Sequence, residues 1–165
     1  MRTRLPLAAL GLGLLGVVPF IALGIAAVST TDAVQSGRLL LALVAYGAVV
    51  LAFLGGVHWG FVLHPVLPEG LSPDSRRDAT RLGLGVLPSL IGWLAMLIPL
   101  LGLPEIGLAV LIVGFLATIV TEHALRRRGL VPPAYVAMRW ALSIVVLVVL
   151  ISVLALRLIG ARLIF

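Results

Sequence analysis

The stretch that decides the fold is YGAVVLAFLGGVHWG, residues 46–60. It is apolar enough to lie in a bilayer, yet it is rich in small residues and contains one histidine, His58. Small residues let transmembrane helices pack with their backbones close together. The stretch therefore predicts the central helix of a membrane bundle.

The composition of the whole chain indicates a membrane protein. Of its 165 residues, 62% are hydrophobic and 11% are charged, and the mean hydropathy is +1.26. One soluble core of this size cannot hide so much apolar surface. The net charge of +6 comes from arginines that lie between the apolar runs, which argues against a nucleic-acid partner. Cysteine is absent, so disulfides and thiolate metal sites are excluded.

Five segments are long enough to cross a hydrocarbon layer, which takes about 20 helical residues. The first follows two arginines as a secretory signal would, but its apolar run exceeds the roughly 7–15 residues of a signal core. We therefore predict an all-α integral membrane protein, a bundle of five transmembrane helices forming one domain over residues 1–165. The helices are expected near 5–28, 39–63, 80–101, 104–122 and 134–158.

The arginines predict the orientation of the bundle. One side of the predicted membrane carries Arg2, Arg4, Arg76, Arg77, Arg81, Arg126, Arg127 and Arg128, and the other carries Arg38, Arg157 and Arg162. Because positive residues favour the cytoplasmic side, the N-terminus is expected in the cytoplasm and the C-terminus outside. The bilayer itself is the expected partner, with anionic lipid headgroups bound by Arg76, Arg77, Arg126, Arg127 and Arg128.

Prolines mark several of the predicted boundaries. Ser72-Pro73 and Pro104-Glu105 each have the pattern of a helix start. Pro19 and Pro88 fall inside predicted helices, where each removes a backbone donor, so kinks are expected there. Neighbouring helices can satisfy the carbonyls that are freed.

One motif has a misleading spacing. Residues 11–16, GLGLLG, match the glycine spacing of a dinucleotide-binding loop, but that function needs a preceding strand and a helix that starts at a phosphate. Here the glycines lie inside an apolar helix. We interpret them as helix-packing residues.

The opening stretch is expected to pack along a line of small side chains. Ala48, Ala52, Gly56 and Gly60 recur at every fourth position, and Gly55 lies beside them. Such a line predicts close contact with a neighbouring helix. His58 turns toward a different side, so this helix is expected to be central.

The predicted topology gathers the intramembrane polar residues in the inner half of the bilayer and leaves the outer half with almost none. An ionisable residue inside a membrane is costly enough to be a candidate for function. The candidate ligand-binding residues are His58, Trp59, Ser89, Glu122, His123 and Arg139. No metal-ligand spacing and no catalytic pair is present in the sequence, and no cofactor is indicated.

Each of these residues also has a structural explanation. Glu122 lies four positions before Arg126, which favours a local ion pair at the membrane surface. Arg139 can extend to the headgroups. His58 can bond a backbone carbonyl and anchor the bundle.

Two runs together resemble a known family. Residues 46–60 and the segment GLGVLPSL, residues 83–90, followed by Trp93-Leu94-Ala95, resemble the vertebrate transmembrane protein 69 family and its bacterial relatives, a domain of unknown function. The segment LGVVPF, residues 15–20, and Arg139 are similar as well. The resemblance implies a small multi-pass protein of a bacterial inner or mitochondrial inner membrane, and we expect the bacterial inner membrane. It implies no catalytic or binding residue.

Three classes of function remain open. The favoured one is a non-enzymatic structural, assembly or accessory protein, with a homo-oligomer or a membrane-protein partner. The second is a site for a small ligand or ion around His58, Glu122 and Arg139, for an anion or for a quinone-like or haem-like molecule. An enzyme that acts on lipid ranks last.

Overall fold

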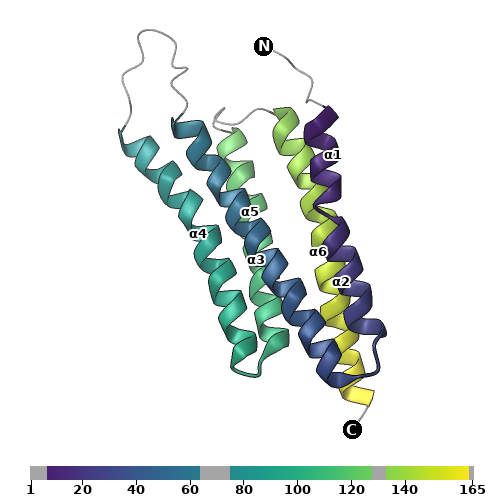
Figure 1. The fold of residues 1–165 in the computed structure, drawn as a ribbon. Helices are drawn as coiled ribbons and strands as arrows, with labels where there is room; N and C mark the ends of the chain where they lie inside the picture. The colour runs from purple at the N-terminus through teal and green to yellow at the C-terminus, as the bar shows by residue number, and fades with distance from the viewer. Residues whose placement is uncertain (1–6, 64–74, 128–132, 164–165) are drawn as a thin grey trace.

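The computed structural model describes residues 7–63, 75–127 and 133–163. In these ranges the chain is helical throughout, apart from short connections (Figure 1). Five stretches are long and apolar enough to cross a membrane, which agrees with the predicted number. The helices are α1 (Leu7–Leu15), α2 (Val18–Ser29), α3 (Ala33–Leu63), α4 (Ser75–Leu100), α5 (Pro104–Arg127) and α6 (Pro133–Leu163).

Helices α1 and α2 follow one another in the same direction, and from α2 on the helices run alternately down and up, as Figure 1 shows. The start of α1, the end of α3, the start of α4, the end of α5 and the start of α6 share one end of the bundle. We call this end the arginine-rich end, because most of the arginines lie in or next to the helix ends there. Helix α3 packs on α2, α4 and α5, and α6 packs on α2 and α5.

An apolar core fills the middle of the bundle. Fully buried side chains come from α2 (Phe20), α3 (Leu43, Leu51) and α5 (Leu111, Phe115). Phe20 and Phe115 meet edge to face with ring centroids 6.0 Å apart. Large apolar side chains also cover the outside of the helices, as expected for surfaces that face lipid.

The first transmembrane stretch is broken just before Pro19. Helix α1 ends at Leu15 and α2 begins at Val18, with Pro19 in its first turn. Pro19 has no N–H to donate, and the turn that precedes it opens the helical ladder. The hydroxyl of Tyr46 on α3 donates to the carbonyl of Gly16, with 2.9 Å between the oxygens. A neighbouring helix thus supplies a donor at the break.

Helix α3 begins earlier than predicted, at Ala33 instead of near residue 39. The carboxylate of Asp32 accepts the backbone N–H of Val34 at 2.9 Å, so Asp32 caps the helix. Hydropathy alone predicts the start where the strongly apolar run begins. A polar first turn that includes Ser36 and Arg38 precedes this run.

The other predicted boundaries differ in outcome. Helix α5 begins at Pro104 as expected, after a turn in which Gly102 has a φ of +80°. Helix α4 is continuous through Pro88. The predicted start at Ser72-Pro73, and the side chains of Arg2, Arg4, Arg76, Arg77 and Arg128, lie outside what the structure describes.

Candidate intramembrane polar site

Helices α3 and α4 pack closely at Gly55 and Trp59, which flank His58 along α3. Gly55 of α3 lies against the backbone of Gly85 of α4, so close that a Cβ on Gly55 would overlap the Gly85 carbonyl. One helical turn along, the indole of Trp59 covers Gly85 and donates to the carbonyl of Leu82 at 3.1 Å. Trp59 is therefore a packing residue at the edge of this contact.

The predicted line of small residues is only partly right. Gly92 of α4 packs on Ala48, but Gly56 and Gly60 are exposed, and a Cβ on either would meet no described atom within 4 Å. Steps of four residues turn by about 400°, so each step moves the line about 40° around the helix. The contact instead follows alternating steps of four and three residues, and Gly60 has rotated away from it.

An ion pair is buried between α5 and α6. Arg139 Nη2 lies 2.7 Å from Glu122 Oε1, and their side chains are 4% and 1% exposed. Glu122 lies two residues before the end of its transmembrane stretch, and Arg139 lies three residues after the start of its own. Their burial leaves each charge dependent on the other for compensation.

Arg139 also joins this pair to α3. Its Nη1 donates to the carbonyl of Leu54 at 3.4 Å, and Leu54 lies one turn before His58. Thr118 and Ser143 are buried one turn from Glu122 and Arg139 on the same helices. The arrangement forms a polar layer across α3, α5 and α6.

Two sequence interpretations of this layer were wrong. Glu122 pairs with Arg139 across the bundle, whereas Arg126 lies over the ring of Trp140 at 6.0 Å. Arg139 is buried and does not extend to the headgroups. The i, i+4 rule describes exposed helix surfaces, but Glu122 faces the interior.

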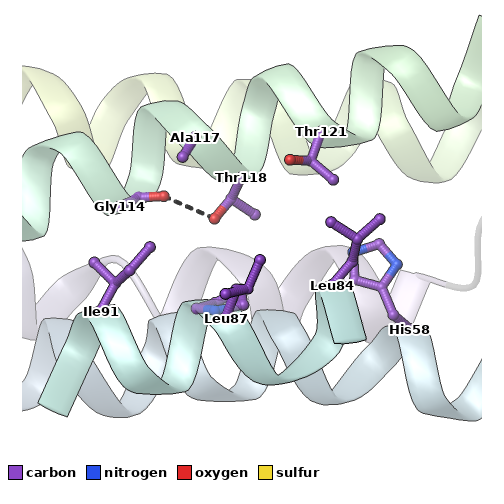
Figure 2. Close-up of a pocket in the computed structure, with 9 residues that line it drawn as sticks. His58, Leu84, Leu87, Ile91, Gly114, Ala117, Thr118 and Thr121 are labelled. Carbon is purple, nitrogen blue, oxygen red and sulfur yellow. Dashed lines mark hydrogen bonds between the residues drawn. The ribbon is translucent and has the colours of Figure 1, made fainter. Parts of the chain in front are cut away.

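His58 lines a small cavity next to this layer (Figure 2). The cavity lies between α3, α4 and α5, and its volume is about 70 Å³. His58 is 4% exposed, and the Thr118 hydroxyl donates to the carbonyl of Gly114 at 2.8 Å. The other residues of the wall are Leu84, Leu87, Pro88, Ile91, Ala117 and Thr121.

His123 and Ser89 do not join the polar layer. His123 is exposed and stacks on Trp140, with ring centroids 5.4 Å apart and an interplanar angle of 26°. Ser89 is half-buried on α4 and is not part of the cavity wall. Of the six predicted ligand-binding residues, the structure thus brings Glu122 and Arg139 into direct contact, and His58 lies beside this pair.

A second polar layer lies at the opposite end, where the sequence predicts almost no polar residues. Arg157 of α6 pairs with Glu105 of α5 at 3.0 Å and donates to Ser36 Oγ at 2.7 Å. Ser36 in turn donates to the carbonyl of Ala27 at 2.7 Å, so four helices are linked. The sequence could have indicated this pair, because Glu105 lies in the first turn of one helix and Arg157 lies near the end of another helix on the same side.

The geometry limits the chemistry of the site. The cavity volume of about 70 Å³ is well below the roughly 300–1,000 Å³ of sites for drug-sized ligands and is sufficient for water or a small ion. Within the described ranges no three His, Asp or Glu side chains group as metal ligands would.

Comparisons with known proteins give a family but no activity. The family model described as a protein of unknown function, DUF3429, matches residues 5–155. The protein named Transmembrane protein 69 from Xenopus tropicalis is 39% identical over 92 residues, which is 56% of this chain and 33% of that protein. The mouse protein of the same name is 39% identical over 92 residues, 34% of its length. The matched part thus spans about a third of these relatives. No solved structure matches.

Proposed function

The chain belongs to the DUF3429 family of multi-pass membrane proteins, as its resemblance predicted, and we propose that it is a non-enzymatic protein that assembles with another transmembrane helix through the outer face of α3. The observation that carries the proposal is the exposed pair Gly56 and Gly60. Their spacing is that of the small-xxx-small motif by which transmembrane helices associate.

The exposed face of α3 suits a helix partner. Val49, Phe53, Gly56 and Gly60 recur at alternating steps of four and three, so they form one stripe, and all four are exposed. No described atom lies within 4 Å of a Cβ placed on either glycine, so a second backbone can approach. Glycine inside a helix costs about 0.5–1 kcal/mol relative to alanine. A close partner offsets that cost, as Gly85 does for Gly55 within the bundle.

The charged residues support a structural role. Arg139 contacts Glu122 and the carbonyl of Leu54, and in this way joins three helices. Charges used in this way hold a bundle together and are not free to take up a substrate. We place the protein in the bacterial inner membrane with the arginine-rich end in the cytoplasm, following the excess of arginine at that end.

The test is the oligomeric state and the partner content of the protein in mild detergent. Gly56→Leu with Gly60→Leu should release the partner, whether it is a second copy or another membrane protein. Gly83→Leu is the matched control, because Gly83 on α4 is equally exposed and open. If the double variant keeps its mass and its co-purifying proteins, or if Gly83→Leu loses them equally, the proposal fails.

The cavity supports a second candidate, a site for water or a small ion. Its wall combines the imidazole of His58 with the hydroxyls of Thr118 and Thr121. Pro88 has no N–H, so the carbonyl of Leu84 on the same wall lacks its helical donor. These groups can solvate a water or a small ion.

Proton or anion flux into liposomes tests this candidate. Thr121→Val keeps the volume but removes a hydroxyl, and His58→Leu removes the imidazole. Both variants should slow a flux that uses the cavity, while Ser89→Ala on the half-buried side of α4 should leave it unchanged. Equal flux in all variants and in empty liposomes would eliminate the candidate.

A further inference from the structure

Trp140 of α6 is covered by two side chains from α5. His123 stacks on its ring, and the guanidinium of Arg126 lies 6.0 Å from the ring centroid. Arg127 is exposed and follows His123 by four residues, so it lies on the same side of α5. We call these four residues the Trp140 cluster.

The Trp140 cluster carries positive charge that no described acid neutralises. The acidic side chains that the structure describes are Asp32, Glu105 and Glu122. Asp32 and Glu105 lie at the opposite end of the bundle, and Glu122 is 1% exposed in its contact with Arg139. Among the side chains that the structure describes, no carboxylate therefore pairs with Arg126 or Arg127.

The depth of the cluster is that of lipid headgroups. Trp140 lies about one turn inside the start of its transmembrane stretch, and the stretch of α5 ends at Ala124, between His123 and Arg126. Tryptophan is enriched at this level, where one side of the ring meets acyl chains and the other meets water. This position favours a lipid headgroup over a soluble anion, since a site for a soluble anion does not require the membrane boundary.

An apolar track leads from the membrane interior to the cluster. Val113, Leu116 and Val120 are 61%, 46% and 68% exposed, and they continue in steps of three and four residues to His123 and Arg127. One stripe of α5 thus changes from apolar side chains to cationic ones at the membrane boundary. This stripe matches the two parts of a phospholipid. Its acyl chains can lie along the apolar side chains, and its charged headgroup can contact the cationic ones.

We propose that the Trp140 cluster binds the headgroup of an anionic phospholipid, whose acyl chain lies along Val113, Leu116 and Val120. Arg126 and Arg127 contact the phosphate, and His123 and Trp140 form the floor beneath it. This site is independent of the assembly face on α3, since it lies on α5 and α6.

The test measures lipid binding to the whole protein in detergent. Phosphatidylglycerol and phosphatidylcholine with identical acyl chains are added, and binding is followed by native mass spectrometry and by the shift in melting temperature. Arg126→Gln with Arg127→Gln should weaken phosphatidylglycerol binding about 25-fold, roughly fivefold for each arginine lost near the surface, and should leave phosphatidylcholine binding unchanged. Arg126→Lys with Arg127→Lys should retain most of the affinity.

Arg38→Gln is the matched control. Arg38 is an exposed arginine near the start of α3, which lies at the end of the bundle opposite to the Trp140 cluster. It should leave phosphatidylglycerol binding unchanged. The proposal is overturned if the wild-type protein binds both lipids equally, or if Arg38→Gln weakens binding as much as the double variant does. It is also overturned if inorganic phosphate alone raises the melting temperature as much as phosphatidylglycerol does, because the site would then be one for free phosphate.

Discussion

Glu122 and Arg139 form an ion pair whose side chains are only 1% and 4% exposed. Breaking such a pair by removing one charge leaves the other uncompensated, which costs about 3–5 kcal/mol. We expect Glu122→Gln and Arg139→Gln each to destabilise the protein by that amount, seen as a loss of melting temperature in detergent. The double variant should be more stable than either single one, since no lone charge remains.

The pair at the opposite end provides the control. Glu105 and Arg157 lie 3.0 Å apart but are 34% and 24% exposed. Solvent screening reduces such pairs to about 0–1 kcal/mol, so Glu105→Gln should be nearly neutral. Equal losses for Glu105→Gln and Glu122→Gln would show that burial does not set the strength of the inner pair.

At the residue scale, depth could be predicted from the sequence but partners could not. Helical rise placed Glu122 and Arg139 at one level, and the structure brings them together. The face that each helix turns inward depends on the packing of the whole bundle, which is why His123 was grouped with residues that it does not approach. The pairing of Glu105 with Arg157 was missed because those residues were treated as helix ends and not as neighbours.

Between elements, the α3–α4 contact depends on backbone approach. A Cβ on Gly55 would overlap the carbonyl of Gly85, whereas the same change at Gly56 meets open space. We therefore expect Gly55→Ala to destabilise the bundle by about 1–3 kcal/mol, the usual cost of overpacking. Gly56→Ala should be neutral or stabilising by up to about 1 kcal/mol, because alanine favours the helix. Melting temperatures of the two variants, one position apart, check this directly.

The break between α1 and α2 is the second point where one element depends on another. Tyr46 donates its hydroxyl to Gly16, and its ring also packs on Phe20, with centroids 5.0 Å apart. Tyr46→Phe keeps the ring contact and removes only the donor. We expect a loss of about 1–2 kcal/mol in the free energy of unfolding, the cost of leaving a partly buried carbonyl without its partner. An unchanged stability would mean that the Gly16 carbonyl finds another donor.

At the element scale, the sequence predicted the number of membrane-crossing stretches better than the residues at which the helices begin and end. Twenty apolar residues in succession have few alternatives to a transmembrane helix, so five stretches gave five spans. The start of α3 depends instead on one side chain, Asp32, whose capping bond is worth only about 1 kcal/mol. Hydropathy does not record such a bond.

Across the whole molecule, two polar layers enclose an apolar core. Glu122 and Arg139 lie near one end, and Ser36, Glu105 and Arg157 lie near the other, with buried leucines and phenylalanines between them. Apolar packing does not fix the vertical register of helices in lipid, because the tails are as apolar as leucine. Interhelical polar contacts favour one register, and the buried Glu122–Arg139 pair does so most strongly, since a shift of one turn would separate its charges.

The two polar layers do not determine which end of the bundle faces the cytoplasm. The expected orientation depends on the number of arginines at each end. Because the chain contains no cysteine, single cysteines report the orientation without ambiguity. Leu103→Cys lies in the exposed turn between α4 and α5 and should react with a membrane-impermeant maleimide in intact cells. Gly129→Cys, after the arginines that end α5, should react only after permeabilisation. The opposite labelling pattern would place the arginine-rich end outside, and with it the Trp140 cluster against the outer leaflet.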